Sequence, residues 1–290
     1  MKKPLVSVII PTYNNGRLIE KCIKSILNQS FKNFELIVID DCSKDDTLEV
    51  FKKVKNKRLK FFKTPKNSGS AIARNIGIKN SHGEYVFFID GDCIADKNWI
   101  KEGLKVFEKE KCLGVEGKIY YVSKNYKPTA IDDIVENLEG NQFMTANMAY
   151  LRTILIKVKL FDPKLIRMQD RDLAFKILKY GKIVFYPKME IYHQKFKLNF
   201  RKRLKVYKEC AKTRILLFKR YNDKNQIRFR VYHPLNLFGL FFPPAIFGAL
   251  FLHKYKSLED FKTLLWIYPT VFVERISLWK TCIKERVFLI

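Results

Sequence analysis

The sequence predicts an α/β fold in which a doubly wound, mostly parallel sheet is followed by a helical C-terminal region. Short apolar runs alternate with amphipathic stretches of helical periodicity over the first part of the chain, as in parallel sheets with helices on both faces. Polar or acidic residues follow several of these apolar runs, at the ends of strands where doubly wound sheets bind their ligands.

The predicted elements follow one another in order along the first 107 residues. The β-branched and aromatic runs predict strands over residues 5–10, 34–41, 59–64 and 83–90. The amphipathic stretches between and after them predict helices over residues 16–30, 43–54, 67–81 and 96–107. In the second of these helices, Ser43 and Asp46 form a capping pattern.

The pattern changes after residue 112 but still predicts both kinds of element. Strands are expected over 113–122 and 143–152, separated by a polar loop, and two short strands over 183–187 and 189–194. A helix is expected over 169–182, and a long basic helix over 199–221. We therefore predict one α/β domain over residues 1–195 and a basic helical region over residues 196–290.

The charge of the chain is strongly positive. Of 290 residues, 56 are Lys or Arg and 29 are Asp or Glu, which gives a formal net charge of +27 and predicts an anionic partner. The basic helix precedes an uncharged run over 234–252, interrupted by Pro243 and Pro244. This combination favours contact with an anionic membrane surface. No helix-turn-helix, zinc-finger or RRM signature is found, which disfavours a nucleic-acid partner.

Two carboxylates, Asp90 and Asp92, follow the strand over 83–90 and are separated only by Gly91. Residues two apart on an extended chain point to the same side, so the two charges repel unless a cation lies between them. Oxygen ligands of this kind suit Mn²⁺ or Mg²⁺. The alternative is a polar turn in which an aspartate caps the following helix.

Several other candidate residues allow more than one interpretation. Asp40 and Asp41 could bind metal, accept a hydrogen bond from a base or ribose, or cap the next helix, for which Ser43 already serves. Asp170 is a candidate general base near a substrate hydroxyl, although the helix dipole alone favours acids in the first turn of a helix. His193, which follows a strand, is either a packed structural residue or a ligand.

Five blocks of the sequence, taken in order, resemble the family 2 glycosyltransferases. They span roughly residues 5–195 and read VSVIIPTYNN, ELIVIDDCSKDDT, GSAIARNIGI, FFIDGDC and QDRDLAFKILKYG. The resemblance implies the GT-A fold, a Rossmann-like α/β fold. It also implies transfer of a hexose-type sugar from a UDP- or GDP-type nucleotide-diphosphate sugar.

The resemblance implies roles for particular residues. The residues that would meet the nucleotide sugar are Pro11, Tyr13, Asn14, Asp40, Asp41, Arg74 and Asp90. The sugar and acceptor site would include Asn147 and Gln169. Asp92 would bind Mn²⁺ or Mg²⁺, His193 would face the metal or the diphosphate, and Asp170 would be the catalytic base.

The implied reaction inverts the configuration of the sugar. A divalent cation at Asp92 would neutralise the diphosphate while Asp170 accepts the proton of the acceptor hydroxyl. One departure is Gln169, which stands where the family carries a glutamate and which has no charge. We expect an enzyme at the cytoplasmic face of the cell membrane that acts on a glycan or polyprenyl-linked acceptor. The alternatives are a polyprenyl-phosphate monosaccharide synthase and a non-catalytic basic protein that binds anions or nucleic acid.

Overall fold

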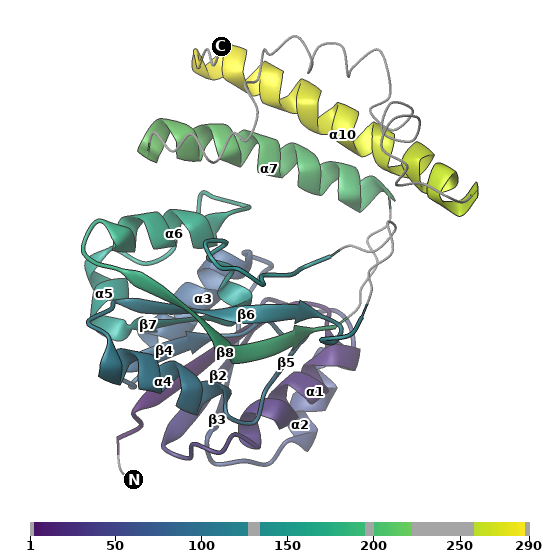
Figure 1. Ribbon diagram of the computed structural model, residues 1–290. Helices are drawn as coiled ribbons and strands as arrows, with labels where there is room; N and C mark the ends of the chain where they lie inside the picture. The colour runs from purple at the N-terminus through teal and green to yellow at the C-terminus, as the bar shows by residue number, and fades with distance from the viewer. Residues whose placement is uncertain (1–2, 127–133, 195–199, 222–257, 288–290) are drawn as a thin grey trace. The chain divides into compact units, whose positions relative to one another are not determined.

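The computed structural model describes residues 3–126, 134–194, 200–221 and 258–287 (Figure 1). The chain divides into two compact units. The first comprises Met1–Lys127, Ile134–Leu165 and Gln169–Lys195, and the second comprises Pro128–Asp133, Ile166–Met168 and Phe196–Ile290.

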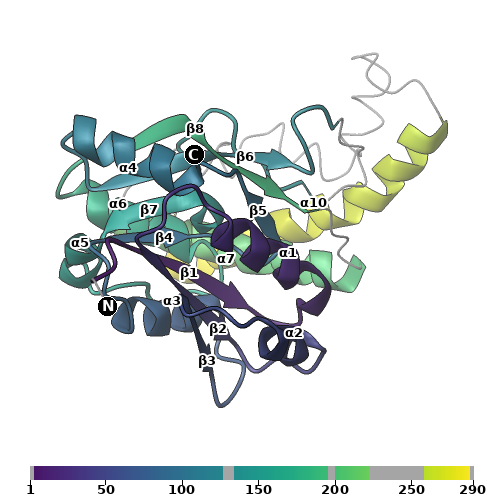
Figure 2. The same cartoon turned by 90° about the horizontal axis from the view of Figure 1, so that it is seen from below.

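A mixed sheet forms the centre of the first unit, in the strand order β3-β2-β1-β4-β7-β6-β8-β5 (Figure 2). Its strands are β1 Val6–Thr12, β2 Phe34–Asp40, β3 Leu59–Lys63, β4 Tyr85–Phe88, β5 Cys93–Ala95, β6 Gly114–Tyr121, β7 Met148–Leu151 and β8 Ile183–His193. Strands β3, β2, β1 and β4 run parallel, as do β6 and β8. Strand β7 is antiparallel to β4 and β6, and β5 is antiparallel to β8. The predicted α/β class with a mostly parallel sheet is confirmed.

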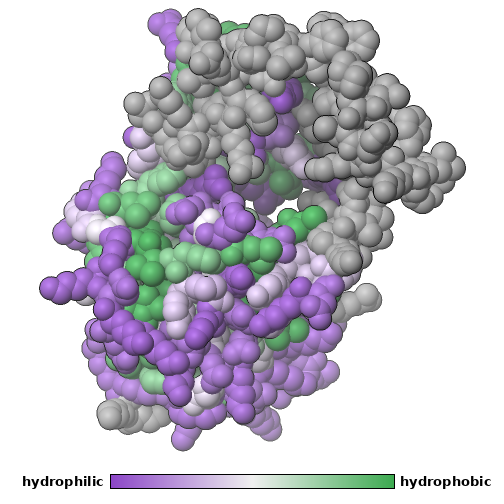
Figure 3. Space-filling model, in the orientation of Figure 1, coloured by the Kyte–Doolittle hydropathy of each residue, from purple (hydrophilic) through white to green (hydrophobic). Residues whose placement is uncertain are grey.

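Helices cover both faces of this sheet. They are α1 Gly16–Leu27, α2 Thr47–Lys53, α3 Ser70–Lys79, α4 Trp99–Lys109, α5 Arg152–Lys157 and α6 Gln169–Leu178, with a 3₁₀ turn η1 at Thr145–Asn147. Strand β1 turns Val8 and Ile10 toward the core that contains α1, α2 and α4, and Ile9 toward the core that contains α3, α5 and α6. The alternation of side chains along a strand thus buries both faces, which explains the continuous apolar run. On the side shown in Figure 3, hydrophilic side chains cover most of the first unit, and apolar ones gather near α6 and the first part of β8.

The predicted cap of the second helix is wrong. Helix α2 begins at Thr47, and its N-cap residue Asp46 makes no side-chain capping bond. Ser43 instead donates its hydroxyl to Asp40, at the end of β2. A side chain four residues before the helix therefore stabilises the strand end rather than the helix start.

Two elements were not predicted, and two predicted strands form one. The short strand Cys93–Ala95 exists because it pairs with β8, a partner that lies about one hundred residues further along the chain. Helix α5 follows β7 directly. Strand β8 continues through Pro187. Its register against β6 shifts there, because Gly117 pairs with Tyr186 while the next residue, Lys118, pairs with Glu190, which leaves the extra residues in β8.

The second unit contains the helices α7 Phe200–Tyr221 and α10 Leu258–Glu285. They pack through Ile215 and Cys282, which are fully buried, and an ion pair joins Lys219 to Glu285 with Nζ and Oε2 2.8 Å apart. The predicted helix over 199–221 is confirmed.

Within the described ranges, no helix combines the length and the apolar character needed to cross a membrane. The uncharged run 234–252 lies outside these ranges, so membrane contact stays a prediction.

Candidate active site

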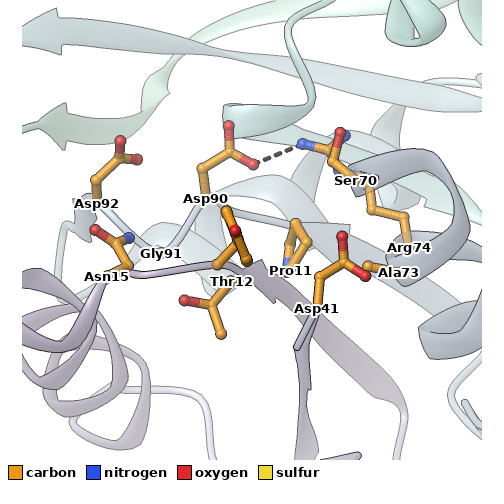
Figure 4. Close-up of a pocket in the computed structure, with 11 residues that line it drawn as sticks. Pro11, Thr12, Asn15, Asp41, Ser70, Ala73, Arg74, Asp90, Gly91 and Asp92 are labelled. Carbon is orange, nitrogen blue, oxygen red and sulfur yellow. Dashed lines mark hydrogen bonds and ion pairs between the residues drawn. The ribbon is translucent and has the colours of Figure 1, made fainter. Parts of the chain in front are cut away.

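A cavity of about 230 Å³ opens at the carboxyl ends of β1, β2 and β4 (Figure 4). The parallel register places Thr12 opposite Asp40 and Ile9 opposite Phe88, so these strand ends lie side by side. The cavity is lined by Pro11, Thr12, Tyr13, Asn15, Asp41, Ser70, Ala73, Arg74, Asp90, Gly91 and Asp92. The expected convergence of polar strand ends on one crevice is therefore present.

Asp90 and Asp92 point to the same side of the chain, as Figure 4 shows. Arg74 Nη2 lies 2.7 Å from Asp90 Oδ1, and the Arg74 side chain is only 6% exposed. A Cβ atom at Gly91 would come within 2.9 Å of Asn15 Nδ2, so a larger residue there would displace the Asn15 side chain in the loop after β1. The Arg74 charge balances Asp90, whereas Asp92 faces a different group.

That group is His193, which the pairing of β5 with β8 places opposite Cys93. His193 Nε2 lies 3.5 Å from Asp92 Oδ1, and Nδ1 lies 3.0 Å from the carbonyl oxygen of Gln194. A carbonyl oxygen can only accept, so Nδ1 carries the proton in this hydrogen bond. In the neutral ring, Nε2 then presents its lone pair toward Asp92. This is the tautomer and second contact typical of a metal-binding histidine.

Cys93, which was not predicted as a site residue, lies beside Asp92 and His193, the two residues predicted to bind metal. One ligand atom each from Asp92, Cys93 and His193 lie within 4.8 Å of one another. Burial, followed by the nearby charges of Asp92 and Asp90, raises the pKa of the Cys93 thiol well above its usual value. Because the thiolate is the form that binds metal, this leaves the carboxylate and the imidazole as the ligands of choice.

Burial also raises the pKa of Asp92, and His193 opposes this shift when its ring is protonated. The Asp92 side chain is 26% exposed, and it lies at the edge of the cavity. A buried carboxylate that is disfavoured in its charged form gains most from a cation placed beside it.

Asp41 both lines the cavity and holds the loop before α3. Its Oδ1 accepts hydrogen bonds from Thr64 Oγ1 at 2.8 Å and from the Ser68 N–H at 2.9 Å. Its Oδ2 accepts one from the Gly69 N–H at 2.7 Å. A carboxylate can accept about four hydrogen bonds, so one acceptor position remains for a ligand.

The structure places Asp40 outside the cavity. It is fully buried and accepts hydrogen bonds from the backbone and the hydroxyl of Ser43. Asn14 also does not line the cavity, because its Oδ1 accepts from the Lys44 N–H and its own N–H donates to Ser43. Pro11 and Tyr13 do line it, and Tyr13 is 45% exposed.

Asp170 lies in the first turn of α6. Burial raises its pKa, and the negative charge of Asp90 raises it further. The charges of Arg74 and Arg171, together with a hydrogen bond from the Arg171 N–H, lower the pKa and so oppose this shift. Asp170 therefore interacts electrostatically with Arg74 and Asp90, which line the cavity, although Asp170 itself does not line it. A pKa raised toward neutrality suits a general base.

Gln169 and Asn147 are held by contacts within the fold. Gln169 Nε2 donates to the hydroxyl of Ser70, a cavity-lining residue. Asn147 is fully buried and lies away from the cavity. Its amide accepts from the Trp99 indole at 2.7 Å and donates to two backbone carbonyl oxygens, those of Lys118 and Met189.

Several lining residues were not predicted as site residues. Thr12, Asn15 and Ser70 carry no charge, although they lie within two of the sequence blocks that resemble the family. Thr12 and Asn15 are adjacent to the predicted Pro11, Tyr13 and Asn14, and this proximity to a strand end is the signal by which they could have been found.

Comparison with known proteins connects this geometry to a family. The sequence pattern described as glycosyl transferase family 2 matches residues 7–202. An uncharacterized glycosyltransferase of Haemophilus influenzae is 35% identical over 186 residues, which cover 60% of this chain and 71% of that protein. The poly(ribitol-phosphate) beta-N-acetylglucosaminyltransferase TarP of Staphylococcus aureus is 45% identical over 130 residues, which cover 41% of this chain but only 38% of TarP.

A solved structure has a similar fold. The mannosyltransferase PcManGT of Pyrobaculum calidifontis, in complex with GDP-Man and Mn²⁺, superimposes with a TM-score of 0.64. The alignment covers 99% of this chain and 88% of that one at 16% sequence identity. At this identity the similarity supports the fold, and the function must be argued from the site.

Proposed function

The chain belongs to glycosyl transferase family 2, and on that premise we propose that it transfers a sugar with inversion from a nucleotide-diphosphate sugar to a hydroxyl group of a cell-surface glycan or polymer. The observation that carries this proposal is the placement of Asp92, with His193 beside it, at the edge of a cavity whose wall includes Arg74 and Asp41. The name of TarP describes transfer of N-acetylglucosamine to poly(ribitol phosphate), and PcManGT was solved with GDP-Man. These relatives support the choice of donors and acceptors to test.

The residues present fit a divalent cation. His193 Nδ1 hydrogen-bonds to the carbonyl oxygen of Gln194, and His193 Nε2 is turned toward Asp92. Asp92 has no ion pair with Lys or Arg among the described residues. Asp92 and His193 would hold Mn²⁺ or Mg²⁺, which when bound would neutralise charge on the diphosphate leaving group. PcManGT, a structural relative, was solved with Mn²⁺.

The remaining residues bind the nucleotide sugar and move the proton. The free acceptor position of Asp41 would take a hydrogen bond from an N–H of the base. Arg74 would hold Asp90 in place beside the diphosphate. Asp170 would accept the proton of the acceptor hydroxyl as its oxygen attacks the anomeric carbon from the face opposite the leaving diphosphate. One displacement of this kind inverts the configuration.

The proposal is tested by release of the nucleotide diphosphate. UDP-GlcNAc and GDP-mannose are each incubated with the full chain and Mn²⁺ or Mg²⁺, with poly(ribitol phosphate) or a polyprenyl phosphate as acceptor. Asp92→Asn and Asp170→Asn serve as inactive controls. We expect metal-dependent release by the wild type alone and a product of inverted anomeric configuration by NMR. Equal release by the wild type and Asp92→Asn would contradict the proposal.

We also propose that the second unit brings the enzyme to the cytoplasmic face of a membrane. Helix α7 ends in Lys219 and Arg220 and carries many further basic residues. Such a helix is attracted to anionic lipid headgroups, and the attraction falls as salt rises. The chain should co-sediment with phosphatidylglycerol vesicles at low salt but not with phosphatidylcholine vesicles. Equal sedimentation with both would contradict this part.

A further inference from the structure

A buried carboxylate anchors the loop between β6 and η1. Glu116, on β6, is 1% exposed, and its two oxygens accept four hydrogen bonds from this loop. The backbone N–H groups of Asn141, Gln142 and Phe143 donate at 2.7, 2.9 and 2.6 Å, and Asn137 Nδ2 donates at 2.8 Å. Convergence of several backbone N–H groups on one anion fixes a local backbone conformation.

The conformation that Glu116 fixes is one that the loop would not adopt alone. Gly140, Asn141 and Phe143 have φ values of 85°, 63° and 55°. For the two residues with side chains, a left-handed backbone is unfavourable. The Gly140 N–H donates to Asn137 Oδ1 at 2.9 Å, so the carboxylate and one amide together hold the whole turn.

The loop reaches the proposed catalytic base through one further residue. Gln142 Oε1 accepts a hydrogen bond from Arg171 Nη2 at 2.9 Å. The backbone N–H of Arg171 donates to Asp170 Oδ1 at 2.9 Å, and the Arg171 charge lowers the pKa of Asp170 against the effect of burial. A continuous series of contacts therefore runs from Glu116 through Gln142 and Arg171 to Asp170.

A charged residue at position 116 is costly to the fold. Burial raises the pKa of Glu116, and the four hydrogen bonds from the loop only partly offset this effect.

None of the four residues that donate to Glu116 is among those that line the cavity. The anchor thus acts on the side of Asp170, and it has no direct contact with the cavity-lining residues that would bind the nucleotide.

We propose that Glu116 is a positioning residue for sugar transfer, which holds the turn of residues 140–143 so that Gln142 and Arg171 keep Asp170 in place for the acceptor. This inference rests on the proposed role of Asp170 as the base. A glutamine at position 116 offers only one oxygen, and its NH₂ group faces backbone N–H donors. The turn is then free to relax, and small displacements at a reacting group lower rates strongly.

The experiment compares Glu116→Gln with a matched control, Glu35→Gln. Glu35 is also a buried glutamate with several hydrogen bonds, to Ser7, Lys60 and His82, but it lies on β2 away from this loop. Each full-length variant is assayed for nucleotide release from UDP-GlcNAc and GDP-mannose with Mn²⁺ and poly(ribitol phosphate), and for UDP affinity by calorimetry. Amide hydrogen exchange is followed over residues 137–143 and 169–173 in the same variants.

We expect Glu116→Gln to lower transfer about tenfold or more, to leave UDP affinity within about twofold and to raise exchange in both segments. Glu35→Gln should change neither transfer nor exchange there, even if it is less stable. Gln142→Ala keeps the backbone N–H that binds Glu116 and removes the 2.9 Å bond from Arg171 Nη2, but it leaves the 3.4 Å bond from Arg171 Nε to the carbonyl oxygen of residue 142. It should therefore lower transfer less than Glu116→Gln does, with raised exchange in 169–173 alone.

Two results overturn the inference: unchanged exchange at 169–173 in Glu116→Gln, or a loss of UDP affinity as large as the loss of transfer. A wild-type chain that releases no nucleotide from either donor contradicts the proposed function instead. In that case hydrogen exchange still decides whether Glu116 positions the segment that bears Asp170.

Discussion

Two pairs of aspartates follow the two strands that flank β1, and the structure uses them differently. Asp40 and Asp41, at the end of β2, accept hydrogen bonds from backbone N–H groups and hydroxyls of neighbouring loops. Asp90 and Asp92, after β4, face the side chains of Arg74 and His193 and are more exposed. Carboxylates whose oxygens receive main-chain donors hold loops, whereas those that face cationic or titratable side chains at a cavity edge can take a ligand.

The largest expected effect is that of Asp92→Asn. If Asp92 holds a cation at the leaving group, the amide should lower turnover by about 10³-fold, since metal ions contribute several kcal/mol of charge stabilisation. Nucleotide release measures the rate, and the melting temperature with UDP and Mn²⁺ measures binding. The Mn²⁺-dependent part of the thermal shift should disappear, and its full retention would remove Asp92 from the metal site.

Asp170→Asn should lower turnover by about 10²-fold or more through loss of a general base. It should also raise the melting temperature at neutral pH. Burial raises the pKa of Asp170 in the folded state, so the wild type loses stability as pH rises through that pKa. The advantage of the variant should therefore vanish below the ordinary pKa of an aspartate. Thermal unfolding of both proteins across this pH range tests the sign, and an advantage that grows as pH falls would contradict it.

Asp41→Asn tests the intermediate case, because this residue both holds a loop and lines the cavity. In the variant, the amide nitrogen of residue 41 would face a backbone N–H group, that of Ser68 or Gly69, which now donates a hydrogen bond to the carboxylate. Because this bond is lost, the free energy of unfolding should fall by about 1–2 kcal/mol. UDP affinity should fall with it, by about tenfold. Chemical denaturation and calorimetry measure the two quantities. A change in UDP affinity without any change in stability would show that the loop contacts are incidental.

The smallest expected effect is that of Tyr150→Phe. The Tyr150 hydroxyl is buried and has no hydrogen-bond partner in the described part of the chain, and burial raises its pKa well above the usual value. Removal of an unpaired buried hydroxyl should leave the free energy of unfolding unchanged or raise it by up to about 1 kcal/mol. Urea denaturation measures this difference. A loss of 2 kcal/mol or more would indicate a buried water that pairs with the hydroxyl.

Much of the first half of the fold could be predicted from the sequence. Strands β1 to β4 and helices α1, α3 and α4 are set by local alternation and helical periodicity, which need no distant partner. The candidate residues at strand ends followed from the same pattern, and Asp41, Asp90 and Asp92 do line one cavity. Arg74, which also lines it, was predicted only from the resemblance to the family. Asp40 and Asn147 carry the same kinds of polar group, but the fold turns them toward neighbours within the structure.

By itself, the sequence determined the class of fold, the family and the acids at the strand ends, because periodicity and ordered motifs are properties of local segments. The tertiary structure alone decided which acids remain available. It pairs β5 with β8, and so brings His193 to the adjacent residues Asp92 and Cys93. It also closes the loop of residues 137–143 around Glu116. The reason is physical: the role of a carboxylate depends on the donors and charges around it, and in a folded chain most of these come from distant segments.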